Sequence, residues 1–279
     1  MSGPLTAEQC AAFHSDGFVV LPAFYQPNEL EPIQRDIHAI IGLVIEQQGL
    51  TLDRKPFSPE TFDFGFQALI AHNRDLGSRV YDAVKQIPAF IRLVTSLKHE
   101  AVVRQVRETD QPGIAAGGYG IRIDNPGEEK FRAGWHQDYP AQIRSLDGLV
   151  FWSPLLPVTE ELGPVEFCLR SHKDGLAPVH TLDMSNPGKS GAYGLTLVEE
   201  EKCVSGYQKV APLTQPGDLV LVDFLTIHRS GLNRSTRSRW SMQMRWFNFE
   251  ECTGRRLGWP GSFVAGNELR AIHPELVVD

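Results

Sequence analysis

The chain changes its pattern near Gly117, and that change limits the folds open to it. Before this point apolar residues recur every three or four positions, as in Leu30, Ile33 and Ile37, which is typical of amphipathic helices. After it come short apolar runs separated by Gly, Pro, Asn and Asp, which predict short strands. Helices followed by many short strands favour a mainly β domain with α, an antiparallel sandwich or barrel buttressed by N-terminal helices.

Local signals place the expected helices. Thr6 and Gln9 form a capping-box pattern that opens a short helix near the N-terminus. Asn28 is expected to cap a longer helix. A second helical stretch, 75–97, should break near Pro88, because proline suits the first turn of a helix better than its interior.

The expected strands follow from the apolar runs. Their ranges are 17–22, 118–124, 134–139, 147–156, 164–170, 207–213, 217–227 and 239–249. The segment 174–206 is rich in Gly, Ser and Asn, and we predict that it is a loop or lid. We expect a single domain over residues 1–279, with helical support in about 1–100 and a β core in about 115–250.

Composition and charge exclude several classes of function. No apolar run approaches the roughly 18 residues of a membrane-spanning helix. The net charge is −7 with no dense basic stripe, which argues against nucleic-acid and membrane-surface partners. The four cysteines are scattered, which argues against a zinc site or a disulfide framework. Reduced thiols and the lack of a signal-peptide pattern predict a cytoplasmic location.

The pattern His-x-Asp, a common half of a metal site, occurs three times, beginning at His14, His136 and His172. The first lies at an expected helix end and the third in a charged turn, so we interpret both as solvated polar segments. His136 is flanked by aromatic residues in a strand-like run. Because residues two apart on a strand share a face, His136 and Asp138 should present imidazole and carboxylate to one point.

A third ligand is expected from His228, which follows a buried-strand pattern and precedes a turn. Two histidines and one carboxylate form a facial triad that holds iron(II) and leaves coordination positions open. Beyond it, Arg239 and Ser241 lie on the polar face of an alternating strand. Since a buried arginine needs an anionic partner, they are candidates to bind the far carboxylate of a dicarboxylate. An ordinary edge strand with a solvated polar face is the alternative.

With these residues in place, the chain resembles the phytanoyl-CoA dioxygenase family of Fe(II)/2-oxoglutarate-dependent oxygenases over nearly its full length. The motifs that carry the resemblance are Asp16-Gly17-Phe18-Val19-Val20-Leu21-Pro22, Trp135-His136-Gln137-Asp138, Phe151-Trp152-Ser153-Pro154-Leu155, Glu161-Leu162-Gly163-Pro164, Ser171-His172-Lys173-Asp174-Gly175, Pro216-Gly217-Asp218 and His228-x-Ser230-x-x-Asn233-x-Ser235. The chain departs from the family pattern at Arg170, where the family often has glycine.

The resemblance implies a double-stranded β-helix, or jelly roll, with Fe(II) as the metal and 2-oxoglutarate and O2 as cosubstrates. It places Arg239 at the position of the 2-oxoglutarate arginine. Arg122 and Trp152 are further candidates for the cofactor pocket, and ordinary strand residues are the alternative for both. The implied reaction is hydroxylation of an unactivated C–H bond, with succinate and CO2 as co-products. Asp138 favours oxygenation, since related halogenases have a small residue in its place, and desaturation and cyclisation stay open as other outcomes.

The substrate is expected to be a small metabolite, because family members act on diverse small molecules. Tyr139, Gln142, Arg144 and Arg170 are candidates to contact it, and an anionic substrate is expected if the arginines reach the cavity. Three other functions remain open from the sequence: a metal jelly-roll dioxygenase or isomerase that needs no cosubstrate, a non-catalytic metal-binding relative, and a hydroxylase that modifies proteins. A monomer and a small homo-oligomer are both compatible with the sequence.

Overall fold

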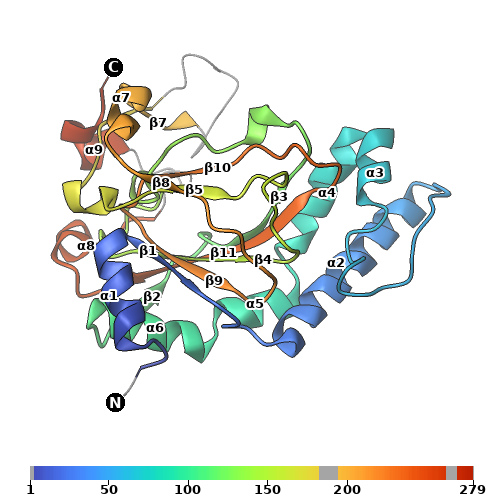
Figure 1. The fold of residues 1–279 in the computed structure, drawn as a ribbon, viewed down its shortest axis with the longest axis horizontal. Coiled ribbons are helices and arrows are strands. Elements are labelled where there is room, and N and C mark those ends of the chain that lie inside the picture. The colour runs from blue at the N-terminus through green and yellow to red at the C-terminus, as the bar shows by residue number, and fades with distance from the viewer. Residues whose placement is uncertain (1–2, 182–193, 262–268, 279) are drawn as a thin grey trace.

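A computed structural model describes residues 3–181, 194–261 and 269–278, in which two antiparallel sheets pack together beside a layer of helices (Figure 1). The strands are β1 (Phe18–Leu21), β2 (Pro112–Ile114), β3 (Gly120–Asp124), β4 (Leu149–Pro154), β5 (Val165–Cys168), β6 (Val179–His180), β7 (Thr196–Leu197), β8 (Lys209–Val210), β9 (Leu219–Asp223), β10 (His228–Ser230) and β11 (Arg239–Asn248). The larger sheet has six strands in the order β1-β9-β4-β11-β2, with β3 also paired to β11. The smaller sheet has the order β10-β5-β8.

The helices belong mainly to the first part of the chain, as predicted. They are α1 (Ala7–Asp16), α2 (Pro27–Gln47), α3 (Phe66–His72), α4 (Arg74–Val84), α5 (Pro88–Val94), α6 (Leu97–Arg107), α7 (Glu200–Ser205), α8 (Cys252–Leu257) and α9 (Leu269–Ile272). The capping box of Thr6 and Gln9 opens α1, and Pro88 starts α5 at the predicted break. The cap of α2 is Gln26 rather than Asn28, because Pro27 already takes the first helical turn.

Strand β11 connects the helical layer to the interior between the sheets. One face of this strand carries Trp240, Met242, Met244 and Trp246, all buried in the core that the helices share with the larger sheet. Trp240 meets the rings of Phe62 and Phe66 edge-on at centroid distances of 5.8 and 5.0 Å. The opposite face therefore points into the space between the two sheets, because neighbouring side chains on a strand alternate.

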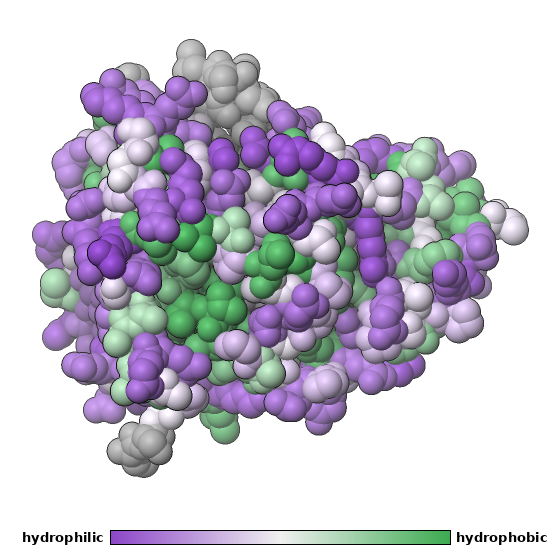
Figure 2. All heavy atoms as spheres, in the orientation of Figure 1, coloured by the Kyte–Doolittle hydropathy of each residue, from purple (hydrophilic) through white to green (hydrophobic). Residues whose placement is uncertain are grey.

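A second core fills the space between the sheets. It includes Phe18 and Val222 of the larger sheet and Phe167 of the smaller one, and Phe18 stacks on Phe167 at 4.3 Å. Figure 2 shows that the face of the molecule seen in this orientation is mostly hydrophilic, with hydrophobic side chains gathered in a recess near β1. None of the helices in the described ranges is long and apolar enough to cross a membrane.

The predicted fold class is confirmed, although no barrel is closed among the described residues. Two local expectations need correction. The run 134–139 is not a strand: only His136 pairs, in an isolated bridge with His228, and a 3-10 turn starts at Tyr139. The segment 174–206 contains short elements such as β7 and α7, and its part at 182–193 lies outside the described residues.

Candidate metal and cosubstrate site

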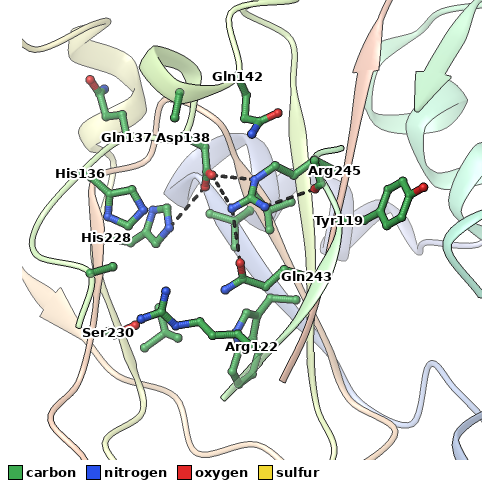
Figure 3. A pocket seen from close by; sticks show the side chains of 18 of the residues that line it. Tyr119, Arg122, His136, Gln137, Asp138, Gln142, His228, Ser230, Gln243 and Arg245 are labelled. Atoms are coloured by element: carbon green, nitrogen blue, oxygen red, sulfur yellow. Dashed lines mark hydrogen bonds and ion pairs between the residues drawn. The ribbon is translucent and has the colours of Figure 1, made fainter. Parts of the chain in front are cut away.

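His136, Asp138 and His228 come together at the end of the space between the sheets (Figure 3). His136 and His228 face each other across the isolated bridge, with backbone N–O distances of 3.0 Å in both directions. The backbone N–H of Asp138 donates to Phe224 O at 3.0 Å, which fixes the carboxylate beside the two rings. One ligand atom from each of the three residues lies within 4.8 Å of the others.

Backbone carbonyls orient both imidazole rings. His136 Nδ1 lies 2.8 Å from Gly134 O, and His228 Nδ1 lies 2.9 Å from Thr226 O. A carbonyl oxygen can only accept, so we assign the proton of each neutral ring to Nδ1, which leaves the Nε2 lone pair free to bind a metal. Burial and the neighbouring His228 lower the pKa of His136 from 6.5 to about 4, so this ring is neutral near pH 7.

Asp138 is buried and ionised. Burial by itself would raise the pKa of its carboxyl, but Arg245 and the two histidines outweigh that effect and lower it to about 2. Arg245 Nε donates to Oδ1 at 2.8 Å. The other oxygen, Oδ2, makes no hydrogen bond to a described residue and lies 3.4 Å from His228 Nε2. Two nitrogen lone pairs and one carboxylate oxygen therefore converge on a common position, as the ligands of one metal ion do.

The triad opens into a cavity of about 400 Å³ whose wall is rich in positive charge. Lys85, Arg122, Arg132 and Arg245 line it, whereas Asp138 is its only acidic lining residue among those described. Lys85, Arg132 and Arg245 were not predicted from the sequence as members of the cavity. The alternation from Arg239 to Arg245 could have indicated Arg245, but nothing near Lys85 or Arg132 signals a site.

Deeper between the strands, Arg122, Asp124 and Arg239 form a buried group that we call the Asp124 cluster. Asp124 accepts from Arg239 Nη2 at 2.8 Å and from Arg122 Nε at 2.8 and 3.0 Å. Burial opposes ionisation of Asp124, but Arg122 and then Arg239 outweigh it and lower its pKa to about 2. Arg239 also donates to Gly163 O. Two cations thus share one internal anion.

Several buried donors near the Asp124 cluster have no partner among the described residues. They are Arg239 Nε, Ser241 Oγ and Trp152 Nε1. Arg239, Ser241 and Trp152 project from β11 and β4 toward the same interior, because Ser241 pairs with Pro154 and Gln243 with Trp152. Buried donors are almost always satisfied in folded proteins, so such a group is typical of a ligand site. Trp152 and Arg122 line the cavity, whereas Arg239 and Ser241 are fully buried and are not among its lining residues.

The sequence matches the family model described as phytanoyl-CoA dioxygenase (PhyH) over residues 13–241, most of its length. The chain belongs to the phytanoyl-CoA dioxygenase family. No curated protein sequence matches it significantly.

Solved structures similar to this member of the phytanoyl-CoA dioxygenase family share its fold at low identity. One is EctD from S. alaskensis with 2-oxoglutarate and 5-hydroxyectoine, at 20% identity and a TM-score of 0.58, covering 90% of this chain and 78% of that one. The carbocyclase SnoK from nogalamycin biosynthesis has 15% identity, a TM-score of 0.57 and coverages of 93% and 92%. The epimerase SnoN from the same biosynthesis has 17% identity, a TM-score of 0.52 and coverages of 86% and 81%. SnoK, a carbocyclase, and SnoN, an epimerase, thus catalyse different reactions on a shared fold.

Only one of the four expected substrate contacts, Gln142, lines the cavity of this family member. Tyr139 is fully buried and its hydroxyl lies 2.6 Å from His273 Nε2. Arg144 donates to Ala116 O at 2.7 Å, behind the wall. Arg170 is an exposed side chain that lies 3.5 Å from Asp16, outside the cavity. The structure therefore does not place Tyr139, Arg144 and Arg170 among the residues that line this cavity.

Proposed function

We propose that this chain is an Fe(II)- and 2-oxoglutarate-dependent oxygenase whose metal is held by His136, Asp138 and His228. The observation that carries the proposal is the convergence of two free Nε2 lone pairs with the unpartnered Oδ2 of Asp138 at a cavity wall. Two imidazoles and one carboxylate are the donor set of non-haem iron(II) oxygenases, and they leave positions open for other ligands. The residues present therefore fit the metal.

The unpartnered donors fit 2-oxoglutarate as the cosubstrate. Arg239 Nε, Ser241 Oγ and Trp152 Nε1 could donate to its carboxylates, and the Asp124 cluster keeps one positive charge in excess. A carboxylate bound there gains charge-assisted hydrogen bonds in a site shielded from water. The structure of EctD with 2-oxoglutarate supports this proposal at the level of the shared fold.

Iron(II), 2-oxoglutarate and dioxygen together supply the oxidation of an unactivated C–H bond, with succinate and CO2 as co-products. Backbone carbonyls orient His136 and His228 through Nδ1 so that Nε2 of each ring faces the metal position, and Arg245 keeps Asp138 ionised. We propose hydroxylation as the outcome.

We further propose that the substrate is a small molecule with an anionic group, a carboxylate or a phosphate. Arg132 lines the cavity, is half-buried and forms no ion pair with any described residue. Lys85 lines it as well, and its only described anionic partner, Asp82, is largely exposed at 72%. Under this proposal Arg132→Gln raises KM for the substrate while anaerobic binding of 2-oxoglutarate is unchanged. An unchanged KM would contradict an anionic contact at Arg132.

The experiment that tests the function is an anaerobic titration of the purified protein with Fe(II) and 2-oxoglutarate. We expect the weak visible charge-transfer band of the metal-bound 2-oxo acid. The band should disappear in His136→Ala and need far more 2-oxoglutarate in Arg239→Ala. His14→Ala is the matched control, because His14 begins another His-x-Asp pattern but has an exposed side chain outside the metal cluster.

Two outcomes would overturn parts of the proposal. Iron binding without the band would refute the cosubstrate site and favour a metal enzyme that needs no cosubstrate. Loss of the band in His14→Ala to the same degree as in His136→Ala would refute the choice of ligands.

A further inference from the structure

Arg245 of β11 contacts Asp138 in an unusual way (Figure 3). Its Nε and Nη2 both lie 2.8 Å from the same carboxylate oxygen, Oδ1. Its Nη1 donates to Gly118 O at 3.2 Å, and Nη2 lies 3.4 Å from Gln243 Oε1. The guanidinium is thus anchored on β11 and on the loop before β3 while it holds one oxygen of Asp138.

Arginine–carboxylate pairs frequently use both oxygens, because the planar fork of a guanidinium matches a carboxylate edge. The chain contains such a pair in Arg229 and Glu166, where Nε lies 2.9 Å from Oε1 and Nη2 lies 2.9 Å from Oε2. Arg245 instead leaves Oδ2 of Asp138 without a hydrogen bond and turned toward His228 Nε2. This geometry separates the two oxygens of Asp138 into one that is held and one that is available.

The backbone reinforces this separation. Asp138 N donates to Phe224 O at 3.0 Å, so the main chain of Asp138 is fixed relative to β9 and the loop that follows it. With the main chain and Oδ1 both held, rotation of the carboxylate is restricted. Asp138 is 3% exposed, and no described side chain other than Arg245 donates a hydrogen bond to Oδ1.

We propose that Arg245 is a positioning residue for the metal site: it holds Oδ1 of Asp138 so that Oδ2 alone is presented to the metal. This inference rests on the proposed function for the identity of the ligands. Partners that orient metal ligands typically change metal affinity about 10–100-fold when they are removed. Arg245→Met, which keeps an unbranched apolar stem but donates no hydrogen bond, should weaken metal binding by about that factor.

The test uses the full chain stripped of metal and the metal alone as the probe. Co(II) binding is followed anaerobically by its visible absorption, in competition with a chelator, so no turnover is required. Arg245→Lys should lose less affinity than Arg245→Met, because an ammonium can still donate to Oδ1 but cannot hold it with two nitrogens. The lysine variant also keeps the test valid if the methionine variant does not fold.

Arg107→Met is the matched control. Arg107 forms a similarly buried ion pair, with Asp223 at 2.7 Å, but neither residue lines the cavity. The Arg107→Met variant shows what the loss of a buried arginine does by itself to metal binding. Its affinity for Co(II) should equal that of the wild type.

The outcomes separate this proposal from the proposed function. If the wild type binds Co(II) and Arg245→Met binds it equally or more tightly, positioning by Arg245 is refuted while the metal site stands. If the wild type itself does not bind Co(II), the metal site is refuted and the role of Arg245 with it. An affinity loss of the same size in Arg107→Met would also overturn the proposal.

Discussion

His99 makes the stability of this protein depend on pH in a way that the structure quantifies. The ring is buried beneath the larger sheet, where Nε2 lies 2.7 Å from the hydroxyl of Tyr25 and Nδ1 lies 3.4 Å from Val94 O. Neutral His99 can satisfy both contacts, by accepting from Tyr25 and donating to Val94 O. Burial lowers the pKa of His99 from 6.5 to about 4.

The sign follows from proton linkage. Between pH 6.5 and 4 the unfolded chain binds a proton at His99 that the folded chain does not, so stability falls as the pH falls. A pKa shift of this size corresponds in full to about 3 kcal/mol of the free energy of unfolding. About 2 kcal/mol of this free energy should be lost between pH 7.5 and 5. The loss of stability levels off below about pH 4, the pKa of His99 in the folded protein.

The assay is urea unfolding of metal-free protein at a series of pH values, for the wild type and for His99→Gln. The variant has no titrating group at this position, so its stability should fall by about 2 kcal/mol less than that of the wild type between pH 7.5 and 5. Comparing slopes removes the fixed cost of the substitution and the contributions of other groups. His72→Gln, at an exposed position, should keep the wild-type slope. Equal slopes in the wild type and His99→Gln would refute the reasoning.

Three further substitutions test the packing that supports the site, each measured as the free energy of unfolding in urea. Trp240→Ala removes a fully buried ring between β11 and the helices and should cost about 3–5 kcal/mol; a loss below about 1 kcal/mol would contradict the role of this contact. Gly163→Ala should cost more than about 1 kcal/mol, because φ is +71° and a Cβ would lie 2.5 Å from Leu232 O; wild-type stability would disprove the strain. Asp124→Asn leaves Arg122 and Arg239 without their shared carboxylate and should cost about 3–5 kcal/mol. Unchanged stability would show that these two ion pairs do not stabilise the fold.

The sequence by itself was sufficient to predict the fold class, and it favoured one of the three His-x-Asp patterns. The alternation in 239–249 predicted which face of β11 is apolar, because side chains on a strand alternate regardless of what they meet. The aromatic neighbours of His136 distinguished it from His14 and His172, and the structure brings His136, Asp138 and His228 into one cluster. The division of residues 1–279 into helical support and a β core within one domain stays a prediction.

Only the tertiary structure decided which charges meet. Periodicity shows that Arg239 and Arg245 share a face, but it does not say what lies opposite. The pairing of β11 with β3 places Asp124 beside Arg239, and the turn at Tyr139 places Asp138 beside Arg245. These contacts join residues more than a hundred positions apart, and they depend on strand register and backbone hydrogen bonds that leave no local pattern in the sequence.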